Sequence, residues 1–254
     1  MYFEMEGSSV RLAGTMHRVP KRRPLARWVN DAIGWARVIY LEHDKQESDR
    51  CRYAPPGSQP LAQRLPHSWP CIERKYPFDR FRLAHLSRLR PFSVASDVLD
   101  PVDTVEGVER LAIAKSKETQ PRGPRTEYLE TAAQPYALAD GVSDAIWDDA
   151  VSSALDNPAS SKQVLEGCYP AWIAGNFEGV DRISTLHSRN RFPPIKHAVI
   201  TARYYLWLPT IRDLVQSASE PTLVLVGAAH LGGPDGLVAL LAACGLRLTV
   251  APAQ

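Results

Sequence analysis

TLVLVGAAH, residues Thr222–His230, carries the two signals from which the fold can be predicted. Five consecutive strand-forming or apolar residues predict a buried β-strand, and the strand meets a glycine three residues before a histidine. SVRLAGTMH, residues Ser9–His17, repeats the arrangement near the other end of the chain. A single G-x-x-H tetrapeptide carries little information, but two that each follow a predicted strand indicate a shared role.

Gly14 and Gly227 are the residues at which we expect each strand to break, because glycine adopts backbone dihedrals that are closed to other residues. The histidines that follow, His17 and His230, would then lie at the carboxyl ends of their strands. Open α/β sheets bind ligands at this edge, which we call the rim. The two imidazoles are therefore candidates for one common site.

The segment after the first G-x-x-H predicts a βαβ unit. Apolar residues recur at helical spacing over residues 24–34, with Pro24 at the first helical position. Arg37–Leu41 predicts a second strand that delivers Glu42 at its carboxyl end. A right-handed crossover would make the two strands parallel, so that Glu42 opens on the same rim as His17.

The remainder of the chain predicts further helices and strands. Residues 51–77 carry six prolines, which is typical of an irregular loop, and this loop could form a lid over the rim. We expect helices over 105–117, 145–155 and 235–244, a short strand over 127–129, a long helical stretch over 194–218 interrupted by Pro209, and a last strand over 246–250. We therefore predict a single α/β domain over residues 1–254, with a mixed, mostly parallel sheet and helices on both faces.

Composition excludes several classes of protein. The chain is 44% hydrophobic and 23% charged, which is ordinary for a globular domain, and no apolar run approaches the roughly 18–20 residues of a membrane span. Its first residues lack the basic start and apolar core of a signal peptide, so we expect a cytoplasmic protein. The four cysteines form no C-x-x-C pair, and we expect them to be reduced.

Charge is distributed unevenly along the sequence. There are 17 Lys and Arg against 9 Asp and Glu up to Arg90, and 6 against 16 from Pro91 to Asp181. A basic first third could indicate a nucleic-acid partner, but no stacking or helix-turn-helix motif accompanies it. We expect these arginines to pair with the acidic middle and with solvent, and we expect no nucleic-acid partner.

Six motifs occur in order along the chain: G-T-x-H from Gly14, Glu42 after the second strand, L-E-T-x-x-Q from Leu129, W-x-x-G from Trp172, the pair Arg189-Asn190, and V-G-A-x-H-L-x-G from Val226. Together they resemble the TraB/GumN family, which is related to the Tiki-type metalloproteases and more distantly to erythromycin esterases and ChaN-like proteins. The resemblance spans Gly14 to Val250, and its last motif is the most specific. It implies the predicted α/β fold and a metal-dependent hydrolase.

Two histidines and a carboxylate with an open position form the arrangement by which a metal ion activates water. We therefore expect His17, Glu42 and His230 to hold a divalent ion such as Mn²⁺, Co²⁺ or Zn²⁺. Glu130, at the end of a predicted strand, is a candidate general base; alternatively, it is a carboxylate at a helix start. If the strand continues as far as His43, this residue should point to the opposite face, and Asp44 could then return to the rim as an extra ligand.

Arg189 is charged at every relevant pH and could hold an oxyanion, with Asn190 beside it orienting a carbonyl or water. A helix-start salt bridge and cap is the alternative role for this pair.

The expected substrate is a peptide or a small molecule, and peptide-bond hydrolysis is the leading activity. Two alternatives remain open. One is a metal-independent hydrolase in which His17 or His230 is the general base, as the resemblance to erythromycin esterases implies. The other is a non-catalytic scaffold that keeps the fold and binds a peptide or small ligand. The sequence leaves the oligomeric state undetermined.

Overall fold

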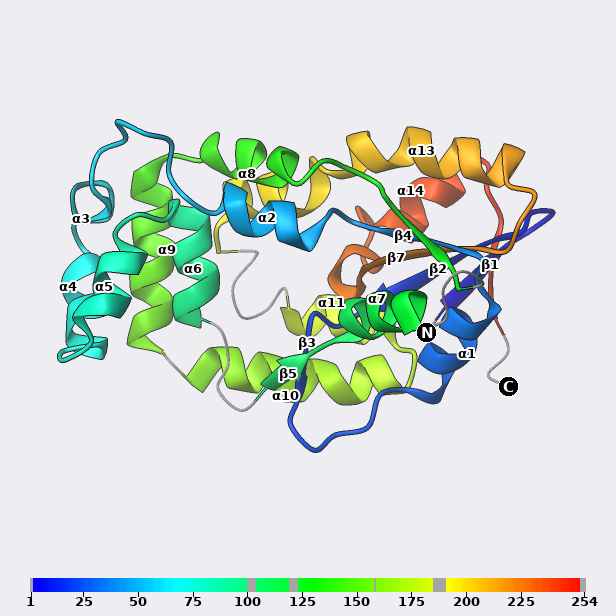
Figure 1. The fold of residues 1–254 in the computed structure, drawn as a ribbon, viewed down its shortest axis with the longest axis horizontal. Coiled ribbons are helices and arrows are strands. Elements are labelled where there is room, and N and C mark those ends of the chain that lie inside the picture. Colours follow the sequence, from blue (N-terminus) through cyan, green and yellow to red (C-terminus); the bar gives the residue numbers. More distant parts are fainter. Residues whose placement is uncertain (1, 100–103, 119–122, 158, 185–190, 252–254) are drawn as a thin grey trace.

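A six-stranded mixed sheet forms the centre of the structure, a computed structural model that describes residues 2–99, 104–118, 123–157, 159–184 and 191–251 (Figure 1). The strands are β1 (Tyr2–Met5), β2 (Val10–Thr15), β4 (Val38–Leu41), β6 (Arg125–Tyr128), β7 (Thr222–Gly227) and β8 (Leu248–Val250). Their order is β6-β4-β7-β2-β1-β8, with β6, β4, β7 and β2 parallel and β1 antiparallel to both of its neighbours.

The two strands of the G-x-x-H motifs are neighbours in this sheet. β2 and β7 pair in parallel from Val10 opposite Thr222 to Thr15 opposite Gly227. β7 also pairs with β4, so it lies between the two strands of the predicted βαβ unit. That unit is parallel as expected, but its strands are separated by a strand from the other end of the chain.

Both faces of the sheet are covered by helices, because the side chains of β7 alternate between two cores. Leu223 and Leu225 pack with residues of α1 (Arg27–Trp35), α7 (Val108–Glu118), α10 (Ala159–Ile173) and α11 (Phe177–Ser184). Val224 and Val226 pack with α13 (Tyr204–Ser217) and α14 (Leu237–Ala243) on the other face. The predicted α/β domain with helices on both faces is confirmed.

A third core lies in a helical lobe at one end of the molecule (Figure 1). Its helices are α3 (Leu61–Arg64), α4 (Trp69–Lys75), α5 (Arg80–Leu86), α6 (Pro91–Leu99), α8 (Ala133–Asp140) and α9 (Asp144–Asp156). Helices α3 and α4 fall within residues 51–77, so the expectation of an irregular loop is wrong there. Pro70 lies in the first turn of α4, where a missing N–H costs no hydrogen bond. The role of this segment as a lid stays a prediction.

Several other elements differ in extent from the prediction. Helix α1 begins at Arg27 rather than Pro24. The expected helix over 105–117 is divided, because Thr104–Glu106 forms strand β5, which pairs with β3 (Arg18–Pro20) before α7 begins. The last helix is α14 over Leu237–Ala243, and the last strand is shortened to Leu248–Val250.

The stretch over 194–218 is helical, but its irregularity is not at the expected proline. It comprises α12 (Pro193–Lys196), a π-helical turn (His197–Thr201) and α13, which contains Pro209. Pro209 has no N–H to donate to the carbonyl of Tyr205, one helical turn earlier. Tyr205 is 78% exposed, so water can hydrogen-bond to that carbonyl instead. In the described part of the chain, no helix combines the length and hydropathy that a membrane span requires.

Candidate functional site

Gly14 lies inside β2, whereas Gly227 is the last residue of β7, and neither has a positive φ. The expectation of unusual backbone dihedrals at these residues is therefore wrong. What the glycines supply is space. A Cβ atom on Gly14 would lie 2.7 Å from Cδ1 of Leu231, and one on Gly227 would lie 2.9 Å from Nε2 of His17.

The three residues predicted to bind a metal meet around Gly227. Oε1 of Glu42, which follows β4, accepts a hydrogen bond of 2.7 Å from the Gly227 amide. The same oxygen lies 3.9 Å from Nε2 of His17 and 3.8 Å from Nε2 of His230. Glu42 and His230 are buried, whereas the His17 side chain is 61% exposed. The rim thus brings two imidazole nitrogens to one carboxylate oxygen.

Residues at the start of α13 hold His230 in place. The Tyr204 hydroxyl donates a 2.9 Å hydrogen bond to the His230 carbonyl, and the ring of Trp207 lies 4.8 Å from the imidazole, centroid to centroid. This packing leaves His230 little freedom to move. Exposed His17 is the partner that can adjust.

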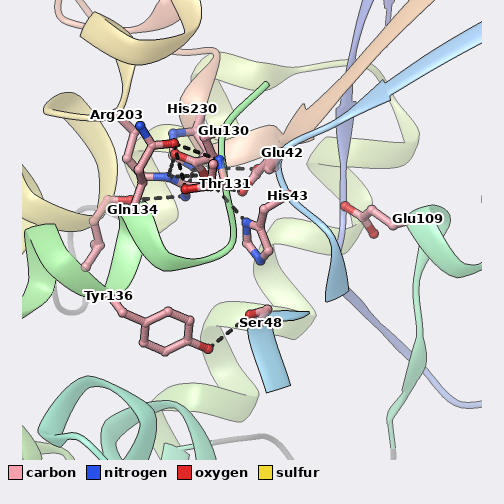
Figure 2. Close-up of polar contacts among 12 residues, drawn as sticks. Glu42, His43, Ser48, Glu109, Glu130, Thr131, Gln134, Tyr136, Arg203 and His230 are labelled. Carbon is pink, nitrogen blue, oxygen red and sulfur yellow. Dashed lines mark hydrogen bonds and ion pairs between the residues drawn. The ribbon is translucent and has the colours of Figure 1, made fainter. Parts of the chain in front are cut away.

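A second group of potential metal ligands adjoins the first. Glu42, His43 and Glu130 each offer a ligand atom, and these atoms all lie within 4.8 Å of one another (Figure 2). Among the described residues, this is the group whose ligand atoms lie that close together. It shares Glu42 with the predicted ligands but contains His43 and Glu130 instead of His17 and His230. An ion held by the predicted three residues would therefore draw His17 inward.

The expected orientations of His43 and Asp44 are wrong. β4 ends at Leu41, so the alternation of side chains along the strand stops before His43. Nδ1 of His43 consequently lies 3.5 Å from Oε1 of Glu130. Asp44 instead caps α2 (Lys45–Cys51), where it accepts hydrogen bonds from two backbone amides of the first turn.

The L-E-T-x-x-Q motif holds Glu130 in position. Oε1 of Gln134 accepts a hydrogen bond of 2.7 Å from the amide of Thr131 and closes the turn. The Glu130 amide donates to the carbonyl of Glu42 at 3.0 Å, continuing the pairing of β6 with β4. The two carboxylates therefore emerge side by side from neighbouring strands. The W-x-x-G motif has a structural role, because Nε1 of Trp172 donates to the carbonyl of Gly14 at 2.8 Å.

Arg203 is the central residue that the sequence did not reveal. Its Nη2 donates to Oε2 of Glu42 at 2.6 Å, and its Nε donates to Oε1 of Glu130 at 3.0 Å (Figure 2). Its Nη1 lies 3.4 Å from Nε2 of His230, and the guanidinium lies over the ring of Trp207. No motif marks Arg203. Its only signal is its place in an aromatic helical segment, where a buried arginine requires carboxylate partners.

The charges of this cluster favour a further cation. Burial raises the pKa of Glu42, but Arg203, His230, His17 and the Gly227 amide together hold it well below its usual range. Burial lowers the pKa of Arg203, and the two carboxylates more than offset this, raising it above its usual value. One guanidinium thus faces two carboxylates, which leaves an excess of negative charge before the histidines are counted.

Glu109, on α7, orients His17 from the opposite side. Its Oε1 lies 2.9 Å from Nδ1 of His17, and it also accepts a hydrogen bond from the hydroxyl of Thr15. The Glu109 carboxylate is the main cause that raises the pKa of His17 to about 9, against an opposing effect of burial. A carboxylate on Nδ1 leaves Nε2 directed at the site, as in many metal-binding histidines.

The described residues fit a divalent cation on three observations. Space is left above Gly227, the carboxylates outnumber the guanidinium, and Nδ1 of His43 is buried without a hydrogen-bond partner. Arg189 and Asn190, the predicted oxyanion pair, lie outside the described residues.

Comparison with known proteins gives one match. The model of the TraB/PrgY/gumN family matches residues 3–250 of the chain. No curated protein and no solved structure matches it.

Proposed function

The chain belongs to the TraB/PrgY/gumN family, and on this premise we propose that it is a metal-dependent hydrolase that cleaves a peptide bond at the rim. The observation that carries the proposal is the convergence of His17, Glu42 and His230 around Gly227. Imidazole and carboxylate groups are the ligands of catalytic sites that keep an open position, and a bound ion would displace the proton that His17, with its pKa raised to about 9, carries at neutral pH.

Mn²⁺, Co²⁺ or Zn²⁺ bound there would supply the Lewis acidity that lowers the pKa of water. The chain's own residues supply positioning and proton transfer. Arg203 holds both Glu42 and Glu130 in place through its contacts with them, and it favours the ionised form of Glu42. Glu130 is the proposed proton acceptor, and His43, 3.5 Å from it, is a neighbouring group that can receive the proton next.

Stabilisation of the oxyanion is proposed for Arg189 and Asn190, as the sequence motif suggests. Glu109 is proposed to act through His17, by fixing the ring so that Nε2 faces Glu42. The substrate is proposed to be a peptide, and small-molecule substrates remain an alternative at the same rim.

Metal binding is the decisive test of this function. Protein purified without chelators is titrated with each of the three ions in a calorimeter and assayed with a general peptidase substrate. Wild type should bind one of them, and the double variant His17→Ala/His230→Ala should lose both binding and turnover. The matched control His67→Ala/His197→Ala removes two exposed histidines away from the rim and should keep both. Absence of binding to wild type, or equal binding to the rim variant, rejects the metal site.

One observation favours a second candidate, a metal-independent hydrolase. Glu109 and His17 form a carboxylate–imidazole pair, which is the arrangement of a general base that activates water directly. Hydrolysis that resists a chelator but is lost in His17→Ala would support this candidate over the first. Hydrolysis that stops on chelation and returns with added ion would exclude it.

A further inference from the structure

Phe78 and Phe81 are almost completely exposed. Their relative exposures are 97% and 91%, the highest of the large hydrophobic side chains in the described part of the chain. Phe78 lies between α4 and α5, and Phe81 lies in the first turn of α5. These two helices are at the end of the helical lobe that is farthest from the sheet (Figure 1).

Local folding does not account for these two side chains. Asp79 caps α5 by accepting a 2.8 Å hydrogen bond from the Arg82 amide. A hydrophobic residue directly before such a cap commonly packs on the fourth residue of the helix, which here is Leu83. Phe78 makes no such contact at 97% exposure, and Leu83 packs into the core of the lobe instead.

The surroundings of the two phenylalanines are basic. Residues 74–82, RKYPFDRFR, hold four cationic side chains and a single acidic one, Asp79, which serves as the helix cap. Arg74 and Arg80 are exposed. Oδ2 of Asp97 lies 3.9 Å from Nη2 of Arg82, whereas Arg74 and Arg80 have no carboxylate ion pair among the described residues. The segment therefore presents two aromatic rings together with a net positive charge of its own, and we call residues 74–82 the aromatic–basic tip.

We propose that the aromatic–basic tip binds the surface of membranes that contain anionic phospholipids. Aromatic side chains insert at the boundary between headgroups and acyl chains, and flanking Lys and Arg contact the anionic headgroups. The tip projects from the end of the molecule away from the sheet, so a membrane can approach it without meeting the rim (Figure 1).

A second copy of the chain fits this surface less well. A symmetric contact through the tip would bring the cationic side chains of the two copies together, and like charges repel. Two exposed rings also cover far less than the roughly 800 Å² per partner of a standard protein interface. A membrane needs only a small insertion combined with charge attraction.

Sedimentation with lipid vesicles tests the proposal. Wild type should bind vesicles of phosphatidylcholine with phosphatidylserine and show little binding to phosphatidylcholine alone. Phe78→Ser/Phe81→Ser should weaken binding roughly tenfold or more, because the inserted apolar area is lost. The control Tyr205→Ser removes a 78% exposed aromatic side chain from α13 and should bind as wild type does.

Charge is tested by a second pair of variants. Arg74→Gln/Arg80→Gln should weaken binding to the anionic vesicles about fivefold for each charge removed. Arg247→Gln, at a side chain that is 81% exposed elsewhere on the surface, should have no such effect. Thermal melts that match wild type show that the variants are folded.

Four results would overturn the proposal. The first is no binding of wild type to the anionic vesicles, and the second is unchanged binding of Phe78→Ser/Phe81→Ser. The third is a change of oligomeric state in that variant on gel filtration, which would assign the tip to contacts between copies. Since aromatic and basic residues also bind single-stranded nucleic acid, tight binding of an oligonucleotide without vesicle binding would equally reject the membrane.

Discussion

Nδ1 of His17 lies 2.9 Å from Oε1 of Glu109, so a residue beyond the end of β2 is held by a helix that reaches it from the far side of the rim. The contact orients His17 although its side chain is 61% exposed. It also couples the protonation of His17 to a residue that lies outside every sequence motif.

Glu109→Gln should lower the pKa of His17 from about 9 toward the ordinary value of 6.5, because the main cause of the shift is removed. Two-dimensional NMR of the imidazole against pH measures it. Glu106→Gln, which removes a nearby carboxylate that pairs with Lys45 and Arg110 instead, should leave the His17 pKa in place. Equal titration of His17 in wild type and Glu109→Gln would contradict the assignment.

The same pair makes stability depend on pH. A raised pKa means that protonated His17 stabilises the fold below about pH 6.5 and that this contribution is lost as pH rises through 9. The pKa of Glu109 is lowered, so its contribution is present above 4.5 and is lost as pH falls. The melting temperature of Glu109→Gln should therefore lie below that of wild type. The difference should be largest between about pH 4.5 and pH 6.5 and smaller at pH 10. A margin that is independent of pH would disprove the coupling.

Gly227→Ala and Gly14→Ala should separate function from stability. The Cβ of Ala at 227 would press on Nε2 of the exposed His17, which can move, so the fold should persist and affinity for the metal should fall. The Cβ of Ala at 14 would meet Leu231 and backbone atoms of Ala228, so this variant should lose about 1–3 kcal/mol of unfolding free energy. Urea unfolding and calorimetry measure the two effects. Unchanged metal binding by Gly227→Ala would place the ion elsewhere.

Arg203→Met should be strongly destabilising, since it leaves Glu42 and Glu130 buried without their cation. Breaking a buried ion pair in this way costs about 3–5 kcal/mol. The lowered pKa of Glu42 means that the loss is fully present above pH 4.5 and shrinks as acid protonates the carboxylate. Denaturant unfolding at pH 7 and pH 4 measures it, with the exposed Arg212→Met on the same helix as control. A loss like that of the control would show that Arg203 contributes little to holding the carboxylates.

His43→Ala distinguishes the two groups of potential ligands. If the ion lies between His17, Glu42 and His230, His43 is an outer partner, and its loss should lower affinity by about 10–100-fold without abolishing binding. Calorimetry with His17→Ala/His230→Ala in parallel provides the comparison. Abolished binding in His43→Ala with retained binding in the double variant would move the ion to Glu42, His43 and Glu130.

Residues whose placement depends on a strand and its end were predictable. Apolar runs locate β4 and β7, and the short strand expected over 127–129 overlaps β6, so the sequence places Glu42, Glu130 and His230 at strand ends on one edge. The expectation for His43 fails because it extends the alternation of side chains past Leu41, where β4 ends.

Residues whose role depends on tertiary packing were not predictable in this way. Arg203 and Glu109 enter the site from helices on opposite faces of the sheet, and neither belongs to a motif. The sequence marks Gly14 and Gly227, but their importance lies in the missing Cβ atom and not in unusual backbone dihedrals. The crowding that a Cβ atom would meet exists only once the strands are packed. The pairing of β2 with β7 likewise joins segments from opposite ends of the chain, and local sequence does not encode it.

That pairing has a consequence for how the protein matures in the cell. β7 separates β2 from β4 in the sheet, and Leu12 is matched with Val224 near the other end of the chain. While a ribosome is still translating the segment before Thr222, the strands that carry His17 and Glu42 have no partner between them. The nascent chain therefore cannot bring His17, Glu42 and His230 together until β7 has left the exit tunnel, and a chain that stops before β7 lacks this site.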